Sequence, residues 1–325
     1  MRARGINERM KTFLKVLLVI VILFGAALAY FLLQPPVFAD LTDDTPEDTT
    51  ETDVTETLHP DGRKAELLSA FFGLDNALPR PLNRFIHRET GGKDGMPVIF
   101  SHELDVSTMQ AGDFKVTTAS GQVGDLTCVT LAPANDLGEW RTVLLVGEYG
   151  SIDDQPVKVE IVGDLLSKDQ KVNFRGLSVG VIPLEDGPEM VLAQVVPPSE
   201  WEIGKKATLS PLGGGSGCPP ETTQVVRVTW QGGVTKPGGA EIDDKERLLY
   251  RVTVLKEDGT TAEVTPFAVA DMGDSDNNHR LCLDVEGVPQ AVFFPAGHVT
   301  DPREDLNPET RIELTPSKGW PEPRE

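Results

Sequence analysis

The segment from Asp271 to His279 is the strongest local candidate for a binding site in the chain. The side chains proposed to supply the hard oxygen atoms that Ca²⁺ prefers are Asp271, Asp274, Asp276 and Asn278. The last three alternate like the first three ligands of a calcium loop. An EF-hand would need Gly where His279 stands and a closing Glu where Val285 stands, so a loop of another type is expected. Asp301, Glu304 or Asp305 can complete it. The alternative is a turn whose Asp and Asn side chains cap their own backbone.

Catalytic motifs are incomplete. Gly214 to Cys218 misses the Gly-x-Ser-x-Gly elbow at its last position, and His102-Glu103 lacks a second His where a zincin needs one. The five histidines show no metal-ligand spacing, and they are His59, His87, His102, His279 and His298. His279 and His298 can serve a hydrolase only if the fold brings them to the acids near Asp274, and we expect a non-catalytic protein.

Three cysteines allow one disulfide in an oxidising compartment. Cys218 and Cys282 lie in the same half of the chain and form the favoured pair. The alternative is that all three cysteines remain reduced, with Cys128 and Cys282 packed on strands.

Strands must position these residues, because helical periodicity disappears after Met96. Val157, Val159 and Ile161 alternate with polar residues, which is typical of a half-buried strand. Turn signals recur every 8–15 residues and predict antiparallel sheets. We expect strands at 97–100, 114–118, 126–131, 141–146, 157–162, 176–184, 190–196, 224–230, 248–255, 261–270, 280–285, 291–295 and 310–314.

One stretch has a recognisable pattern. Phe100-Ser101, Leu104-Asp105, Ser107-Thr108, Ala111-Gly112, Phe114 and Val116-Thr117 are followed by a turn at Gly121. The range 96–165 therefore resembles a bacterial Ig-like module of the kind found in S-layer and exported surface proteins. The resemblance implies a β-sandwich that serves as a spacer, an adhesin or a binding platform, and it names no ligand.

The N-terminus indicates export. Five basic residues and one acid among residues 1–15 precede an uncharged apolar run, Val16–Leu33, long enough to cross a bilayer. We expect a retained anchor over 13–33 with the rest outside the cytoplasm. The alternative is a signal peptide cleaved after Ala29 or near Ala39, which would release a secreted protein. Residues 40–58 hold eight acids, seven Thr and no base, so they predict a disordered stalk.

A formal net charge of −21 on 325 residues excludes nucleic acid as a partner, because phosphate binding needs clustered Lys and Arg. We expect an all-β protein with two antiparallel β-sandwich-like domains. Its parts in chain order are a basic cytoplasmic leader (1–12), a transmembrane anchor (13–33), an acidic disordered stalk (34–62), a short helix with an irregular connection (63–95), an Ig-like β-sandwich (96–205), a Gly/Pro linker (206–224), a second β domain (225–315) and a flexible tail (316–325).

The leading functional hypothesis is a membrane-tethered, extracytoplasmic interaction module that binds an unknown envelope or surface partner. The first alternative is a calcium-stabilised exported hydrolase with a site near Asp274 and His279. The second is a structural envelope spacer, which predicts no exposed apolar groove.

Overall fold

The computed structural model describes residues 34–208, 214–274 and 276–314. From Phe38 onward these residues belong to one compact unit that is mostly β, with short helical turns. Between Gln34 and Leu314, within the described ranges, no helix is both long and apolar enough to cross a membrane. The predicted anchor at 13–33 and the predicted tail at 316–325 lie outside the described residues.

The first region is an eight-stranded sheet in the order β1-β5-β6-β3-β2-β8-β7-β4. Only β2 and β8 pair in parallel among these strands. The strands are β1 (Thr42–Asp43), β2 (Leu67–Phe71), β3 (Asp94–Phe100), β4 (Phe114–Thr118), β5 (Asp125–Thr130), β6 (Thr142–Glu148), β7 (Pro156–Ile161) and β8 (Ser178–Ile182). Side chains from β3, β5 and β6 share one apolar core with side chains from β4 and β7. The sheet therefore curls around a single core.

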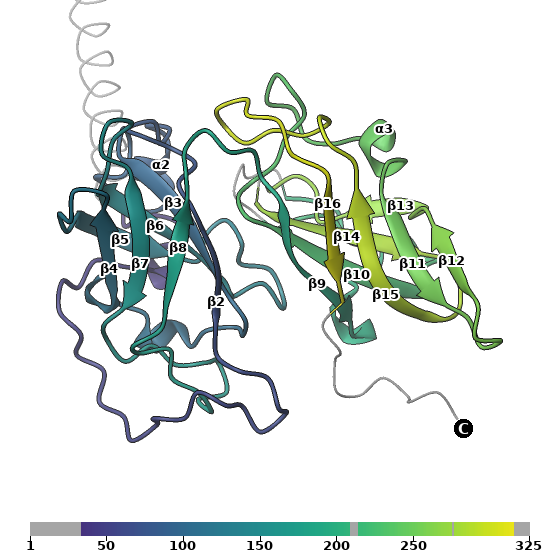
Figure 1. Ribbon diagram of the computed structural model, residues 1–325, viewed down its shortest axis with the longest axis horizontal. Coiled ribbons are helices and arrows are strands. Elements are labelled where there is room, and N and C mark those ends of the chain that lie inside the picture. Colours follow the sequence, from purple (N-terminus) through teal and green to yellow (C-terminus); the bar gives the residue numbers. More distant parts are fainter. Residues whose placement is uncertain (1–33, 209–213, 275, 315–325) are drawn as a thin grey trace, which may run out of the picture. The chain divides into compact units, whose positions relative to one another are not determined.

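The second region has two four-stranded sheets (Figure 1), ordered β13-β14-β10-β9 and β12-β11-β15-β16. Their strands are β9 (Met190–Val196), β10 (Gln224–Trp230), β11 (Arg251–Leu255), β12 (Thr261–Val264), β13 (Ala268–Ala270), β14 (Asn278–Leu283), β15 (Val288–Phe294) and β16 (Thr310–Glu313). Val228 and Trp230 from one sheet pack with Val252 and Phe294 from the other. Burial of these side chains on both inner faces holds the sheets together.

Short helical turns lie in the connections between strands of both regions. They are α2 (Leu82–Phe85), α3 (Asp244–Arg247), η1 (Ala39–Leu41), η2 (Val106–Thr108), η3 (Ala111–Asp113) and η4 (Pro198–Glu200).

The short helix expected within the range 63–95 is wrong as an explanation of its apolar residues. Leu67–Phe71 is the strand β2, which pairs with β3 on one side and β8 on the other. Leu67 and Phe71 stand four residues apart, a spacing that is typical of one face of a helix, yet both are buried in a strand that is covered on both faces. Only the single turn α2 is helical in the range 63–95.

The acidic segment expected to form a disordered stalk is ordered against the first region. Thr42 and Asp43 pair with Thr130 and Val129 of β5. Asp43 Oδ1 accepts a hydrogen bond from the Thr45 N–H, and Asp48 Oδ2 accepts one from the Asp164 N–H. Asp and Thr side chains favour such hydrogen bonds to the backbone. The acidic segment is therefore ordered despite its negative charge.

The expected boundary at residue 205 is also misplaced. The expected first domain (96–205) includes β9, yet β9 pairs antiparallel with β10 in the second region. The eight-stranded sheet likewise takes in β1, β2 and β8, which lie outside the range 96–165. Sequence order alone did not reveal which strands share a sheet.

Candidate functional site

The predicted calcium ligands are all buried, between the end of β13 and the start of β14. Asp276 Oδ1 accepts a hydrogen bond from the Asn278 N–H at 2.7 Å, and Asp276 Oδ2 accepts one from Asn278 Nδ2 at 2.8 Å. Asn278 Oδ1 accepts a hydrogen bond from the Thr229 hydroxyl at 2.8 Å. Asp276 and Asn278 thus cap a turn and hold β14 to β10.

An acidic cavity of about 290 Å³ lies beside this turn. Asp271, Asp274, Asp276, Glu241 and His279 line it, and its described lining includes no Lys or Arg. Burial, with Glu139 and Asp136 nearby, raises the pKa of Asp274 to about 7. Burial and Glu139 raise the pKa of Asp271 and Asp276 well above the usual range. These carboxyl groups therefore hold protons near neutral pH unless a cation compensates them, and calcium binding stays a prediction.

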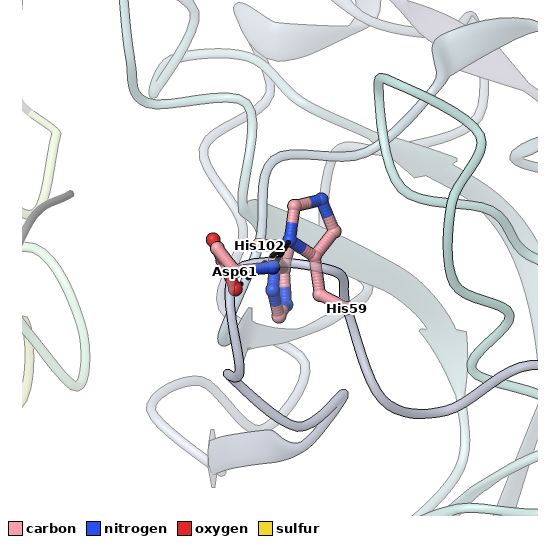
Figure 2. A group of neighbouring side chains, drawn as sticks. All are labelled: His59, Asp61 and His102. Carbon is pink, nitrogen blue, oxygen red and sulfur yellow. Dashed lines mark hydrogen bonds and ion pairs between the residues drawn. The ribbon is translucent and has the colours of Figure 1, made fainter.

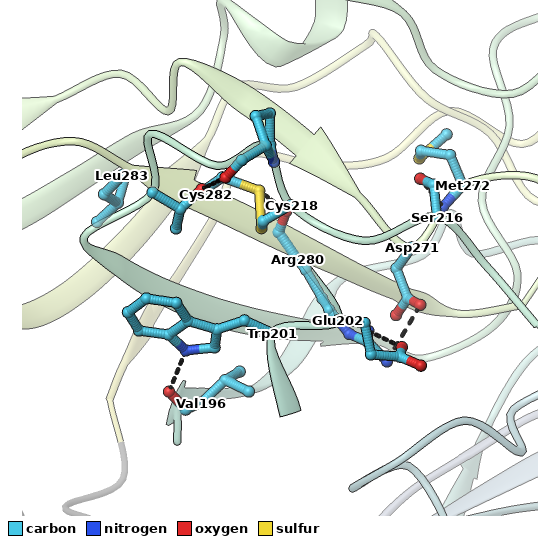
Figure 3. The surroundings of a disulfide bond; sticks show 12 residues. Val196, Trp201, Glu202, Ser216, Cys218, Asp271, Met272, Arg280, Cys282 and Leu283 are labelled. Carbon is cyan, nitrogen blue, oxygen red and sulfur yellow. Dashed lines mark hydrogen bonds and ion pairs between the residues drawn. A yellow bond between two sulfur atoms is a disulfide. The ribbon is translucent and has the colours of Figure 1, made fainter. Parts of the chain in front are cut away.

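Asp271 also belongs to a second group, here called the junction cluster: Asp136 and Glu139 from the first region and Asp271 and Arg280 from the second. Arg280 Nη2 lies 2.9 Å from Glu139 Oε1, 3.3 Å from Asp271 Oδ1 and 3.8 Å from Asp136 Oδ2. Its Nη1 donates to Glu202 Oε2 at 2.5 Å (Figure 3). The guanidinium fills the position that a metal ion would take among three carboxylates.

Charges within the junction cluster are balanced by the protein itself. Burial alone would raise the pKa of Glu139, but Arg227 and Arg280 hold it below its usual range. Arg227 Nε lies 3.5 Å from Glu139 Oε1, and its Nη1 donates to the Gly138 carbonyl at 2.9 Å. Since Glu139 comes from the first region and both arginines from the second, the cluster fixes the two regions to each other.

The structure joins Cys218 to Cys282, the pair that the sequence favoured (Figure 3). Cys282 lies on β14 opposite Val225 of β10. Cys128 is a buried free thiol on β5, and burial raises its pKa to about 12, so it is not a reactive nucleophile.

The two histidines required by the hydrolase hypothesis have different environments. His279 Nδ1 and the Tyr250 hydroxyl form a buried hydrogen bond at 2.7 Å, and burial lowers the pKa of His279 to about 4. His298 is exposed, packs edge-on to Phe294 and is absent from the lining of the acidic cavity. The described residues show no nucleophile paired with a histidine base at this cavity.

Sequence reasoning missed a further group, here called the histidine cluster: His59, Asp61 and His102 (Figure 2). His59 and Asp61 lie in a loop closed by the Leu58–Lys64 bridge, and His102 follows β3. The Ser101 hydroxyl ties the two segments by accepting from the Glu66 N–H and donating to the Lys64 carbonyl. His59 and His102 are distant in sequence, so no local spacing signalled their contact.

A cavity with a volume of about 460 Å³ lies between the two regions. Its wall is mainly apolar, with Phe71, Leu78, Leu82, Ile86 and Leu144 among its residues. Thr142, Asp276 and Asn277 form its small polar part. Asn277 Nδ2 donates to the Trp230 carbonyl at 2.7 Å, so this polar part is already largely satisfied by the protein.

No protein-family model matches the chain, and no curated protein matches it. Among solved structures, the N-terminal part of the bacterial S-layer protein SbsC aligns at 10% identity and a TM-score of 0.26, covering 79% of this chain and 45% of that one. Domains 1–6 of the surface layer protein SbsC align at 9% identity and a TM-score of 0.18, covering 78% of this chain and 40% of that one. The chain spans less than half the length of these proteins, and scores this low carry no argument.

Proposed function

We propose that this chain is a non-catalytic, extracytoplasmic interaction module whose binding site is the 460 Å³ apolar cavity. The cavity carries the proposal, because its volume lies within the range of small-molecule sites and its wall is predominantly apolar. A pure envelope spacer needs no such cavity. The separation of His279 from His298 argues against the hydrolase.

The ligand that fits is a small, predominantly apolar molecule. Asp276 is the only acid on the described wall, and Asn278 already donates to both of its oxygens. A strongly polar ligand would lose its hydration without gaining matching partners, whereas an apolar ligand would gain from burial.

Photoaffinity labelling tests this site. The full-length chain is illuminated with an alkyl benzophenone, and labelled peptides are mapped by mass spectrometry. We expect labelling within residues 77–86 and 131–134. Ala77→Trp should abolish it, because Ala77 is an exposed residue on the cavity wall that Trp would fill. Ala119→Trp, at an exposed turn away from the cavity, should label like wild type. Equal labelling of the two variants would contradict the proposal.

The extracytoplasmic setting is supported by the basic leader, the apolar run Val16–Leu33 and the Cys218–Cys282 disulfide. Disulfides persist mainly in oxidising compartments. We propose that residues 13–33 form a membrane anchor. We also propose that the region 96–165, which resembles an Ig-like module, serves as a platform outside the membrane. A protease added outside intact cells should digest the chain if the chain lies outside the cytoplasm. The protease should leave the chain untouched if the chain is cytoplasmic. Mass spectrometry of the mature N-terminus distinguishes a retained anchor from cleavage near Ala39.

A second candidate property is calcium binding in the acidic cavity, through Asp271, Asp274 and Asp276, with Asn278 beside them. The observation that favours it is a buried carboxylate lining without Lys or Arg among its described residues. Millimolar Ca²⁺ should raise the Tm of the wild type and of Asp244→Asn, which alters an 86% exposed carboxylate. Asp274→Asn should lose the rise. No Tm change in the wild type would reject the site.

A further inference from the structure

We propose that His59, Asp61 and His102 form a site for a divalent transition metal, with Zn²⁺ as the best fit. One potential ligand atom from each residue lies within 4.8 Å of the other two, and the imidazole rings are 5.1 Å apart between centroids. Figure 2 shows the three side chains converging from two segments. The proposal is independent of the apolar cavity and of calcium binding.

The hydrogen bonds of Ser101 determine which nitrogen of His102 is free. The single hydroxyl proton of Ser101 is donated to the Lys64 carbonyl at 3.0 Å. Towards His102 Nδ1, at 2.9 Å, the same hydroxyl can therefore only accept. Nδ1 thus carries the imidazole proton, and Nε2 carries a lone pair.

That lone pair has no partner. His102 is 5% exposed, and its Nε2 is buried without a hydrogen bond. A buried acceptor without a donor is unfavourable and rare in folded proteins. Burial and the nearby Arg63 lower the pKa of His102 to about 4, which agrees with a neutral ring. A metal ion would satisfy this nitrogen.

His59 presents its other ring nitrogen to the same space. His59 Nε2 lies 2.7 Å from Asp169 Oδ2, so it donates a proton to that carboxylate. Nδ1 then accepts a hydrogen bond from the Asp61 N–H at 3.2 Å and lies 2.9 Å from Asp61 Oδ1. In the neutral ring Nδ1 also lies against the acceptor Oδ1, an unfavourable contact that a second ring proton or a cation bound to both atoms would relieve.

Asp61 supplies an ionised oxygen. Burial would raise the pKa of Asp61, but hydrogen bonds from Arg63 hold it well below its usual value. Arg63 Nε and Nη2 both bind Asp61 Oδ2 at 2.8 Å, and the Arg63 N–H donates to Oδ1 at 2.9 Å. Oδ1 keeps a lone pair that faces His59.

Two imidazole nitrogens and one carboxylate oxygen suit Zn²⁺, whereas Ca²⁺ and Mg²⁺ prefer oxygen alone. Asp169 and Ser101 accept hydrogen bonds from the ring nitrogens that face away from the proposed metal, as the outer partners of metal-binding histidines do. His59 and His102 also line a cavity of about 280 Å³, which leaves room for a water as the fourth ligand.

Calorimetric titration of the metal-stripped, full-length chain with Zn²⁺ in non-ionic detergent tests the proposal. We expect one Zn²⁺ per chain at this site, a loss of affinity of about 100-fold in His59→Ala and in His102→Ala, and no change in His298→Ala. His59 lies on a loop and is 14% exposed in its side chain, so its variant is informative even where His102→Ala fails to fold.

Excess Ca²⁺ or Mg²⁺ should not compete with Zn²⁺. The proposal is overturned if the wild type shows no saturable Zn²⁺ binding, or if folded His59→Ala binds as tightly as wild type. In either case His59 is a doubly protonated imidazolium bridging Asp61 and Asp169.

Discussion

The junction cluster and the histidine cluster both bring three potential metal ligands within 4.8 Å of one another, yet their surroundings differ. In the junction cluster Arg280 already lies among the three carboxylates, and Arg227 adds a second positive charge to Glu139. In the histidine cluster the Arg63 guanidinium binds Asp61 Oδ2, Asp61 Oδ1 lies 2.9 Å from His59 Nδ1, and His102 Nε2 has no hydrogen-bond partner. The position of the nearest cation, rather than the number of ligands, distinguishes an internal ion pair from a metal site.

Removing the internal cation should have the largest effect. Arg280→Met leaves Glu139 buried without its closest charge partner, so the free energy of unfolding should fall by about 3–5 kcal/mol. Urea denaturation measures this fall in the free energy of unfolding. Arg311→Met removes a guanidinium that is 49% exposed and paired with exposed Glu313, and should cost less than about 1 kcal/mol. Equal losses in the two variants would show that the junction cluster is not a structural ion pair.

Asp113 is a third buried carboxyl group, and no Lys or Arg among the described residues forms an ion pair with it. Its Oδ2 accepts from the Gln110 N–H, and its Oδ1 has no hydrogen bond. Burial raises the pKa of Asp113 to about 7, and Asp48, Asp43 and Asp164 add to the rise. The folded chain therefore keeps a proton that the unfolded chain releases near pH 4, and this stabilisation is lost as the pH rises to 7.

Asp113→Asn cannot ionise, so it should remove this pH dependence. Between pH 5 and pH 8 the wild type should lose about 2 kcal/mol more unfolding free energy than the variant. Urea denaturation at the two pH values gives the difference, and other titrating groups cancel between the two proteins. Parallel losses in wild type and variant would mean that Asp113 is ionised in the folded state throughout.

The smallest predicted effect concerns the outer partner of His59. Asp169→Asn keeps the shape and an oxygen acceptor for His59 Nε2 but removes the charge, so Zn²⁺ affinity should fall by about tenfold. Calorimetry measures the change. Asp258→Asn, at an exposed turn, is the matched control and should bind Zn²⁺ like wild type. A similar affinity in all three proteins would show that Asp169 does not support the metal site.

Local sequence patterns predicted most strands. The ranges 114–118, 157–162 and 224–230 coincide with β4, β7 and β10 within one residue. Alternation and β-branched residues are local properties, and they suffice where one face of a strand is buried. β2 was missed because both of its faces are covered, and β9 was placed in the wrong region because pairing partners are set by tertiary contacts.

The candidate sites were less predictable for the same reason. The sequence predicts Asp271 as a calcium ligand because of its neighbours in the chain. In the structure, Asp271 pairs with Arg280, and its carboxyl group lies beside Glu139 from the other region. His59 meets His102 only because the loop after residue 57 folds back on the end of β3. The disulfide was accessible to sequence reasoning, since three cysteines leave few pairings.

Anomalous X-ray scattering locates the metal most directly. Crystals of the full-length chain soaked in Zn²⁺ are measured on both sides of the zinc absorption edge. We predict one peak bonded to His59 Nδ1, His102 Nε2 and Asp61 at about 2.0–2.2 Å, and none among Asp136, Glu139 and Asp271. A peak inside the junction cluster, or no peak at the histidine cluster, would contradict the distinction between the two.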